Sequence, residues 1–174
     1  MAVRMTFRHT FHTDPDTFWE KVFFDEEYNR RLYLEALNFR GFEQLALERS
    51  EDGRVTRAVR TVPQDEAPAA VKKVLGGEFF YREEGSFDPE KKIWSYRVIP
   101  SQMASKVDIH GEYWLEDKGG GKSERICTVD LNVKVPFVGK VAEGFIEGQT
   151  RRSYDLAETF TNRFLAEKGL SPAS

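Results

Sequence analysis

His9 is the residue of this sequence whose type and position most directly suggest chemistry. In VRMTFRHTF, residues 3–11, it shares strand parity with Phe7 and Phe11, so it is expected on the dry face of a strand. A neutral imidazole there could bond a ligand hydroxyl or carbonyl, or act as general base in an aldol-type cyclisation. The cyclisation would also need an acid, for which the candidates are Tyr96, Tyr113 and Asp130. The alternative is an interior histidine satisfied by a protein partner.

A second candidate group is a polar band within GFIEGQTRRSYDLAETF, residues 144–160. At about 100° per residue, Gln149 falls in the middle of the apolar arc of a helix, with Arg152 and Ser153 on either side. The arc itself holds Val141, Ala142, Phe145, Ile146, Leu156, Ala157, Phe160 and Phe164, and the opposite, solvated face is predicted to hold Glu143, Glu147, Arg151, Asp155 and Glu158. A buried amide without a partner costs roughly 1–3 kcal/mol. The band therefore faces either polar groups of a sheet, with Arg152 reaching solvent, or a cavity that holds water or a ligand.

Other kinds of reactive site find little support in the sequence. Cys127 is the sole cysteine, which excludes an intramolecular disulfide and favours a small buried apolar residue. The sequence has no His-x-His, no HExxH and no carboxylate cluster with loop spacing, so no metal site and no cofactor are predicted. GGGKS, residues 119–123, lacks the spacing of a phosphate-binding loop and joins two predicted strands.

Size and charge limit the class of protein. The 174 residues suit a single domain, predicted over 1–170 with a disordered tail at 171–174. A net charge of −3 and a pI near 5.7 give no attraction to nucleic acid, and no nucleic-acid partner is expected. There is no apolar run long enough to span a membrane, and the start MAVRMTFRHTFHTD lacks the order of a signal peptide. A cytoplasmic protein is expected.

The elements that would position these residues follow from periodicity and turn residues. A strand at 3–11 precedes two short helices, at about 15–23 and 25–36. A meander of hairpins follows, with strands at 42–50 and 55–62, 78–87 and 91–99, and 105–115 and 123–135. The glycine-rich loop 117–121 is expected to be flexible. A helix of up to about 30 residues closes the chain between Pro136 and Gly169. Its Gly144 and Gly148 predict either a close approach of helix to sheet or a hinge.

Strand parity gives the residues expected to line a cavity between sheet and helix. In the last hairpin the odd-numbered positions are mostly apolar and the even-numbered positions are mostly polar, which places His110 on the wet face. The predicted ligand-binding residues are Phe7, His9, Phe11, Tyr96, Val107, Ile109, Tyr113, Val129, Leu131, Phe145, Gln149, Arg152, Ser153 and Leu156.

The connection 63–77 interrupts the meander with two prolines, a possible short helix at 68–75 and paired glycines. It is either a lid over the cavity or a static surface connection. Its apolar residues Val71, Val74 and Leu75, next to Lys72 and Lys73, suggest transient contact of 67–75 with a membrane surface.

The order of elements resembles the START-like helix-grip (SRPBCC) superfamily, which includes lipid carriers, polyketide cyclases and aromatases. The resemblance rests on TFRHTFHTDPDTFWEKVFFDEEYNRRL, residues 6–32, and VPFVGKVAEGFIEGQTRRSYDLAETFTNRFL, residues 135–165, which are similar to a bacterial branch of unassigned function. It implies an α+β fold, with a strongly curved antiparallel sheet of about seven strands wrapped around a long C-terminal helix and two short helices after the first strand. It also implies a hydrophobic pocket, but no catalytic motif.

Three functions remain open. The principal prediction is a non-enzymatic carrier or sensor of a small hydrophobic ligand, which would be a lipid, a sterol-like or an aromatic molecule. The second is a cyclase- or aromatase-type enzyme using His9. The third is a protein-interaction or regulatory module, which an exposed apolar patch around Phe79, Phe80 and Tyr81 would favour.

Overall fold

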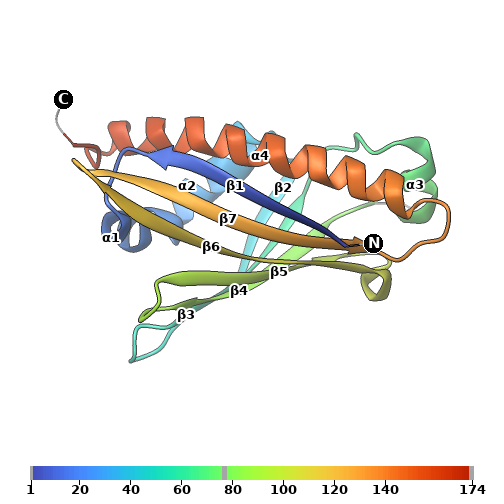
Figure 1. Cartoon of the computed structure of the whole chain (residues 1–174), viewed down its shortest axis with the longest axis horizontal. Helices are drawn as coiled ribbons and strands as arrows, with labels where there is room; N and C mark the ends of the chain where they lie inside the picture. Colours follow the sequence, from blue (N-terminus) through green and yellow to red (C-terminus); the bar gives the residue numbers. More distant parts are fainter. Residues whose placement is uncertain (1, 76–77, 173–174) are drawn as a thin grey trace.

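The computed structural model describes residues 2–75 and 78–172, and the side chains of residues 74 and 75 are also outside the description. Its centre is a seven-stranded antiparallel sheet in the order β1-β7-β6-β5-β4-β3-β2 (Figure 1). The strands are β1 (Val3–Phe11), β2 (Gly41–Arg49), β3 (Val55–Val62), β4 (Tyr81–Asp88), β5 (Ile93–Pro100), β6 (Val107–Gly119) and β7 (Lys122–Val133). The α4 helix (Gly139–Glu167) runs the length of the molecule over one side of this curved sheet. The predicted helix-grip fold is confirmed.

The two short helices between β1 and β2 form where the sequence places them. α1 (Pro15–Phe18) starts at Asp14, whose carboxylate accepts hydrogen bonds from the amide of Thr17 at 2.9 Å and its hydroxyl at 2.7 Å. Each helix then widens into a π-helical turn, α1 into η1 (Trp19–Phe23) and α2 (Glu26–Arg31) into η2 (Leu32–Ala36). The remaining short helices are α3 (Ala69–Leu75) and η3 (Ala104–Lys106). No helix within the described residues is both long and apolar enough to cross a membrane.

α4 lies against β1, and its polar side chains bond the free edge of that strand. The amide of Thr10 donates to Glu158 at 2.7 Å, and Asn162 accepts from the amide of His12 at 2.8 Å and donates to the carbonyl of Thr10 at 2.9 Å. An edge strand otherwise exposes unpaired main-chain groups to water or to another chain. These bonds both protect the edge and hold the helix on the β1 side of the sheet.

The prediction of a fully solvated outer face for this helix is therefore wrong. Arg151 does pair with Glu147 at 3.5 Å, but Glu158 binds the edge of β1. Glu143 is 7% exposed and accepts a hydrogen bond from the amide of Val133 at 3.0 Å. The helix contacts the sheet over a wider arc than an apolar stripe alone indicates, because carboxylates and amides also satisfy main-chain donors.

Two other expectations concern the loop 117–121 and the C-terminal tail. The loop 117–121 is a tight turn, since β6 reaches Gly119 and pairs it with Lys122. Gly119, Gly120 and Gly121 all have positive φ, which glycine adopts without strain. Residues 173–174 of the predicted tail lie outside the described residues.

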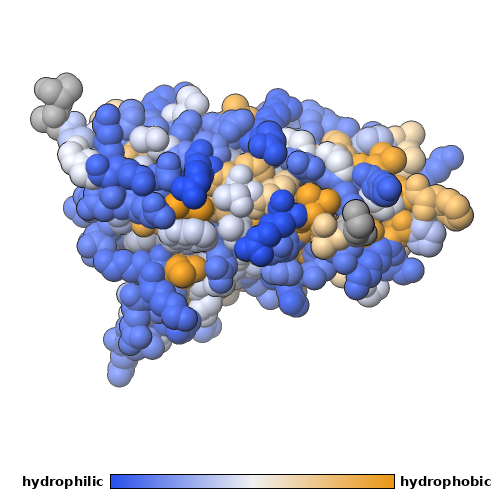
Figure 2. Space-filling view, viewed as in Figure 1, coloured by the Kyte–Doolittle hydropathy of each residue, from blue (hydrophilic) through white to orange (hydrophobic). Residues whose placement is uncertain are grey.

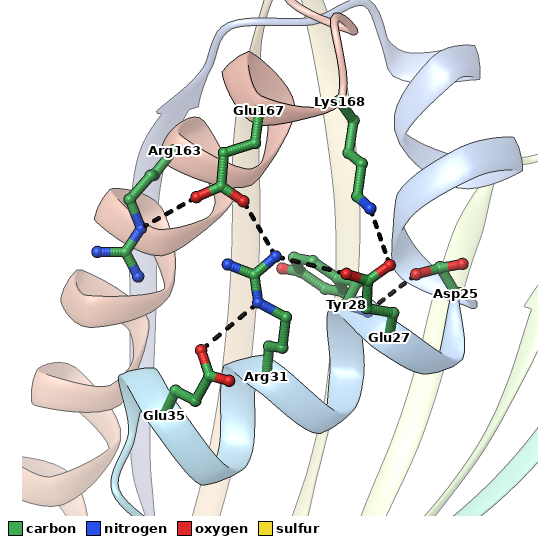
Figure 3. Close-up of polar contacts among 8 residues, drawn as sticks. All are labelled: Asp25, Glu27, Tyr28, Arg31, Glu35, Arg163, Glu167 and Lys168. Carbon is green, nitrogen blue, oxygen red and sulfur yellow. Dashed lines mark hydrogen bonds and ion pairs between the residues drawn. The ribbon is translucent and has the colours of Figure 1, made fainter.

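A network of ion pairs joins α2 to the C-terminal end of α4 (Figure 3). Arg31 lies between Glu167, at 3.0 Å, and the carboxylates of Glu27 and Glu35, and Lys168 donates to Glu27 at 2.8 Å. The hydrogen bond from Lys168 lowers the pKa of Glu27, and the one from Arg31 lowers the pKa of Glu167. Together with the ring contacts of Arg31 on Phe160 and Phe164, these pairs fix α2 on α4.

Acid is expected to loosen α2 from α4. Because the pKa values of Glu27 and Glu167 are lower in the folded than in the unfolded state, their contribution to stability is present above the unfolded value of about 4.3 and is lost as pH falls through the folded values. Amide protection factors in α2 should therefore fall more than those in β6 when hydrogen exchange is compared at about pH 3 and about pH 7. Equal changes in both elements would contradict a local effect.

Candidate functional site

A cavity of about 520 Å³ lies between the inner face of the sheet and α4. Its other walls come from η2, from the turn after it, and from the connection between β3 and β4. The volume is within the range of about 300–1,000 Å³ in which proteins bind small molecules. α4 therefore does not seal against the sheet along its whole length.

The structure brings most of the predicted ligand-binding residues together in the wall of this cavity. They are Tyr96, Val107, Ile109, Tyr113, Val129, Phe145, Gln149, Arg152, Ser153 and Leu156. Phe7, His9, Phe11 and Leu131 do not line it. Phe7, His9 and Phe11 belong to the edge strand β1, on which α4 packs, and Leu131 of β7 lies opposite Val3 of that strand. Parity identified their inward direction correctly, but not the element that covers them.

His9 is the clearest case. Its Nε2 lies 2.8 Å from the carboxylate of Asp155 on α4, its side chain is 7% exposed, and its ring lies parallel to that of Tyr154. The imidazole is thus a link between β1 and α4. The expectation that His9 could reach a cavity is not met.

Sequence reasoning missed Tyr154, the residue that separates the cavity from β1. Its ring stacks on Phe7 with centroids 5.2 Å apart, and its hydroxyl lies 3.2 Å from the hydroxyl of Tyr96 and 3.1 Å from Sγ of Cys127. Tyr154 falls outside the predicted apolar arc, and its long side chain reaches back under the helix. Cys127 is fully buried in this cluster, as predicted.

Part of the polar band of α4 lines the cavity, and part lies at its solvent-exposed edge. Gln149 and Ser153 are partly buried and line the cavity, whereas Arg152 is exposed and pairs with Glu66 of the β3–β4 connection at 3.6 Å. The predicted close approach at Gly144 and Gly148 is wrong, because a Cβ added at either position would meet no atom within 4 Å.

The described part of the connection 63–77 covers part of the cavity. Its predicted helix is present as α3, and Val71 of that helix is 3% exposed and lines the cavity. In this conformation Val71 is not available for the predicted membrane contact of 67–75. The paired glycines at 76–77 lie outside the described residues.

The inner part of the cavity holds a buried ion pair that the sequence analysis did not name. Arg57 is 4% exposed, and its guanidinium donates to Glu83 at 3.3 Å, to the carbonyl of Phe23 at 3.1 Å and to Asn29 at 3.2 Å. The same group lies 5.1 Å from the ring centroid of Trp94. Burial raises the pKa of Glu83, and Arg57 opposes that shift.

A second buried arginine, Arg125, lines the same cavity without a carboxylate partner among the described residues. It is 2% exposed and surrounded by the rings of Phe11, Tyr113 and Tyr154, whose centroids lie 4.8, 5.5 and 4.8 Å from its guanidinium carbon. Its Nη2 donates to the main-chain carbonyl of Tyr154 at 2.9 Å, and its Nε has no partner. No carboxylate in the described part of the chain forms an ion pair with it.

The phenols around the cavity are neutral. Burial raises the pKa of Tyr33, Tyr96, Tyr113 and Tyr154. At neutral pH these hydroxyls can donate or accept hydrogen bonds but carry no charge. The charges of the inner cavity are therefore those of Arg57, Glu83 and Arg125.

Apolar residues on the surface gather towards the end of the molecule where α4 begins (Figure 2). Phe137 is fully exposed, with φ of 67°, and Val141 is 49% exposed. The predicted patch at Phe79, Phe80 and Tyr81 is only partly exposed, with Arg60 lying over the ring of Phe80 and Tyr81 turned to the cavity. The surface feature proposed for a protein-interaction module is thus not at 79–81.

The model of the family described as Protein of unknown function (DUF2505) matches residues 6–165. No protein of curated function matches the sequence. The fold is similar to that of Zhui aromatase/cyclase from Streptomyces sp. R1128, at 14% identity and a TM-score of 0.66, over 97% of this chain and 96% of that one. Norcoclaurine synthase from Thalictrum flavum, in complex with dopamine and hydroxybenzaldehyde, is similar at 16% identity and a TM-score of 0.62, over 91% and 86%. A START superfamily protein from Mycobacterium smegmatis is similar at 13% identity and a TM-score of 0.57, over 94% and 98%.

Proposed function

The chain belongs to the family described as Protein of unknown function (DUF2505), and we propose that it binds a small hydrophobic ligand between the sheet and α4, as a carrier or sensor. The observation that carries the proposal is the cavity of about 520 Å³ beneath that helix. A space of this size forfeits the dispersion contacts that a packed core would make. A ligand restores those contacts.

The wall of the cavity suits a molecule that is mostly apolar. Valines, isoleucines and aromatic rings of the sheet and α4 form its surface, among them Val98, Ile109, Val129 and Ile146. Neutral phenols and Gln149 supply hydrogen bonds without charge. Norcoclaurine synthase, which has the same fold, holds dopamine and hydroxybenzaldehyde, so aromatic ligands are included in the proposal beside lipids and sterol-like molecules.

The proposal does not include catalysis by His9. A cyclisation would require the imidazole beside the ligand, and His9 is instead bound to Asp155 between β1 and α4. His9 therefore cannot act as the base of such a reaction in this arrangement.

The connection 63–77 is the proposed route of entry. Val71 closes the cavity from this side, and the exposed pair of Glu66 with Arg152 joins the described part of the connection to α4. An exposed pair of this kind contributes about 0–1 kcal/mol. Opening the connection would therefore cost little at that contact.

Filling the cavity is expected to weaken binding while leaving the fold intact. In a Ser153→Phe variant the new ring would occupy the space beneath the middle of α4, because Ser153 lines the cavity. The affinity for the neutral apolar probe N-phenylnaphthylamine, measured by fluorescence, should fall at least about tenfold, which is the loss of about 1.4 kcal/mol. Ala166→Phe, at an exposed position of the same helix, is the matched control and should bind as the wild type does.

Native mass spectrometry of gently purified wild-type protein tests the same proposal without a variant. A bound apolar mass that organic extraction removes is expected. Wild-type protein that carries no such mass and binds no apolar probe would refute the binding function.

A further inference from the structure

The two arginines buried in the cavity differ in whether a carboxylate compensates their charge. Arg57 has a carboxylate, a main-chain carbonyl and a side-chain amide as partners. Arg125 is at least as deeply buried, yet its partners are neutral, namely the main-chain carbonyl of Tyr154 and the hydroxyl of Tyr113. The Nε of each arginine is without a partner. Since Arg57 and Glu83 neutralise each other, the inner cavity keeps one uncompensated positive charge.

A buried charge of this kind is expensive for the protein alone. Transfer of an ion from water into a protein costs several kcal/mol after relaxation, even where water penetrates. The three surrounding rings recover part of this, at up to about 2 kcal/mol for a desolvated cation–π contact. A hydrophobic side chain at position 125 would fill the same volume at lower cost. The guanidinium is therefore better explained by what it can bind than by its packing.

We propose that the ligand is an amphipathic carboxylic acid, whose carboxylate binds Arg125 and whose apolar body lies along the valines and isoleucines of the cavity. This inference rests on the proposed binding function and specifies its ligand class. A carboxylate carries the single negative charge that Arg125 leaves uncompensated. It also matches the planar geometry of a guanidinium. Tyr113, whose ring lies beside Arg125, is kept neutral by burial and can donate a further hydrogen bond.

The test compares pairs of probes that differ in the charged group. Delipidated wild-type protein is titrated at about pH 7.5, where carboxylates are ionised, with dodecanoic acid and dodecanol, and in a second arm with naphthoic acid and naphthalenemethanol. The acid of at least one pair should bind about tenfold to a hundredfold more tightly than its alcohol, the effect of a hydrogen bond to a charged group. The arm that shows binding identifies the body of the ligand as aliphatic or aromatic.

Two variants assign the preference to a residue. In Arg125→Met the acid should lose its advantage and bind about as well as the alcohol, whose affinity should not change. Arg97→Met makes the same substitution at an exposed position of β5 and should keep the preference. If Arg125→Met does not fold, the comparison of acid with alcohol on wild-type protein still decides the ligand class.

The outcomes separate the two proposals. Equal affinity of wild-type protein for acid and alcohol overturns the anionic ligand but leaves the binding function standing. An acid preference that survives in Arg125→Met also overturns the assignment to Arg125. If no probe of either pair binds and no apolar probe binds, the binding function itself fails.

Discussion

Replacing Arg57 with methionine is expected to lower the free energy of unfolding by about 3–5 kcal/mol, the cost of removing one partner from a buried ion pair. The substitution would leave Glu83 without a counter-ion and would remove the donor to the carbonyl of Phe23 and to Asn29. Methionine can fill part of the space beside the ring of Trp94, so the loss is mainly electrostatic. Urea denaturation of both proteins measures the difference.

The loss should also depend on pH in a defined direction. Burial already raises the pKa of Glu83 above its usual value, and removing Arg57 takes away the group that opposes this shift. A carboxyl whose folded pKa is raised favours folding when protonated, and that contribution is lost as pH rises through the folded pKa. The deficit of Arg57→Met should therefore be larger at about pH 8 than at about pH 5.

A double variant provides the control for this interpretation. Arg57→Met combined with Glu83→Leu replaces both charges by apolar groups, which is often neutral or stabilising. It should recover more than half of the loss of the single variant and should abolish its pH dependence. A single variant that loses less than about 1 kcal/mol at both pH values would show that the pair is hydrated, and the inner cavity open to solvent.

The sequence predicted the fold well because the signals that define it are local. The alternation in β1, the cap at Asp14 and the turn residues between strands each act within a few positions. Their order along the chain then matched one known arrangement of sheet and helix. The boundaries of α3 and α4 followed from Pro68, Pro136 and Gly169 in the same way.

The site was predicted less well because it depends on which element covers each inward side chain. Phe7 and His9 point inward as parity predicts, but α4 seals them from the cavity, since it is held on the β1 side by Glu158 and Asn162. The sequence of β1 itself contains no signal for this long-range contact with α4. Tyr154 was missed for a related reason, because the helix buries a wider arc than its apolar residues indicate.

The buried charges did leave a signal in the sequence. Arg57 shares parity with Val55 and Val59, and Arg125 shares parity with Cys127 and Val129, so both stand where an apolar residue is expected. Strand parity alone predicts that both arginine side chains point towards the interior. A charged residue at an inward-facing position of a strand thus indicates a candidate binding site, because its burial must be compensated by a partner or a ligand.

Replacing Gly111 with alanine is expected to lower the free energy of unfolding by roughly 3 kcal/mol, the upper end of the usual cost of overpacking a core. A Cβ at this position would lie 2.0 Å from the main-chain oxygen of Thr128 and 2.8 Å from the hydroxyl of Tyr96. Gly111 lets the phenol of Tyr96 lie across β6 towards Tyr154, and this arrangement shapes one wall of the cavity. Because a main-chain oxygen cannot rotate away, the strand itself must move.

Gly144→Ala makes the same change where the added Cβ meets no atom within 4 Å, and it should instead stabilise the protein by about 0.5–1 kcal/mol through helix propensity. Thermal and urea denaturation of the two variants should therefore give shifts of opposite sign, and a Gly111→Ala protein as stable as the wild type would show that Tyr96 does not need this close approach.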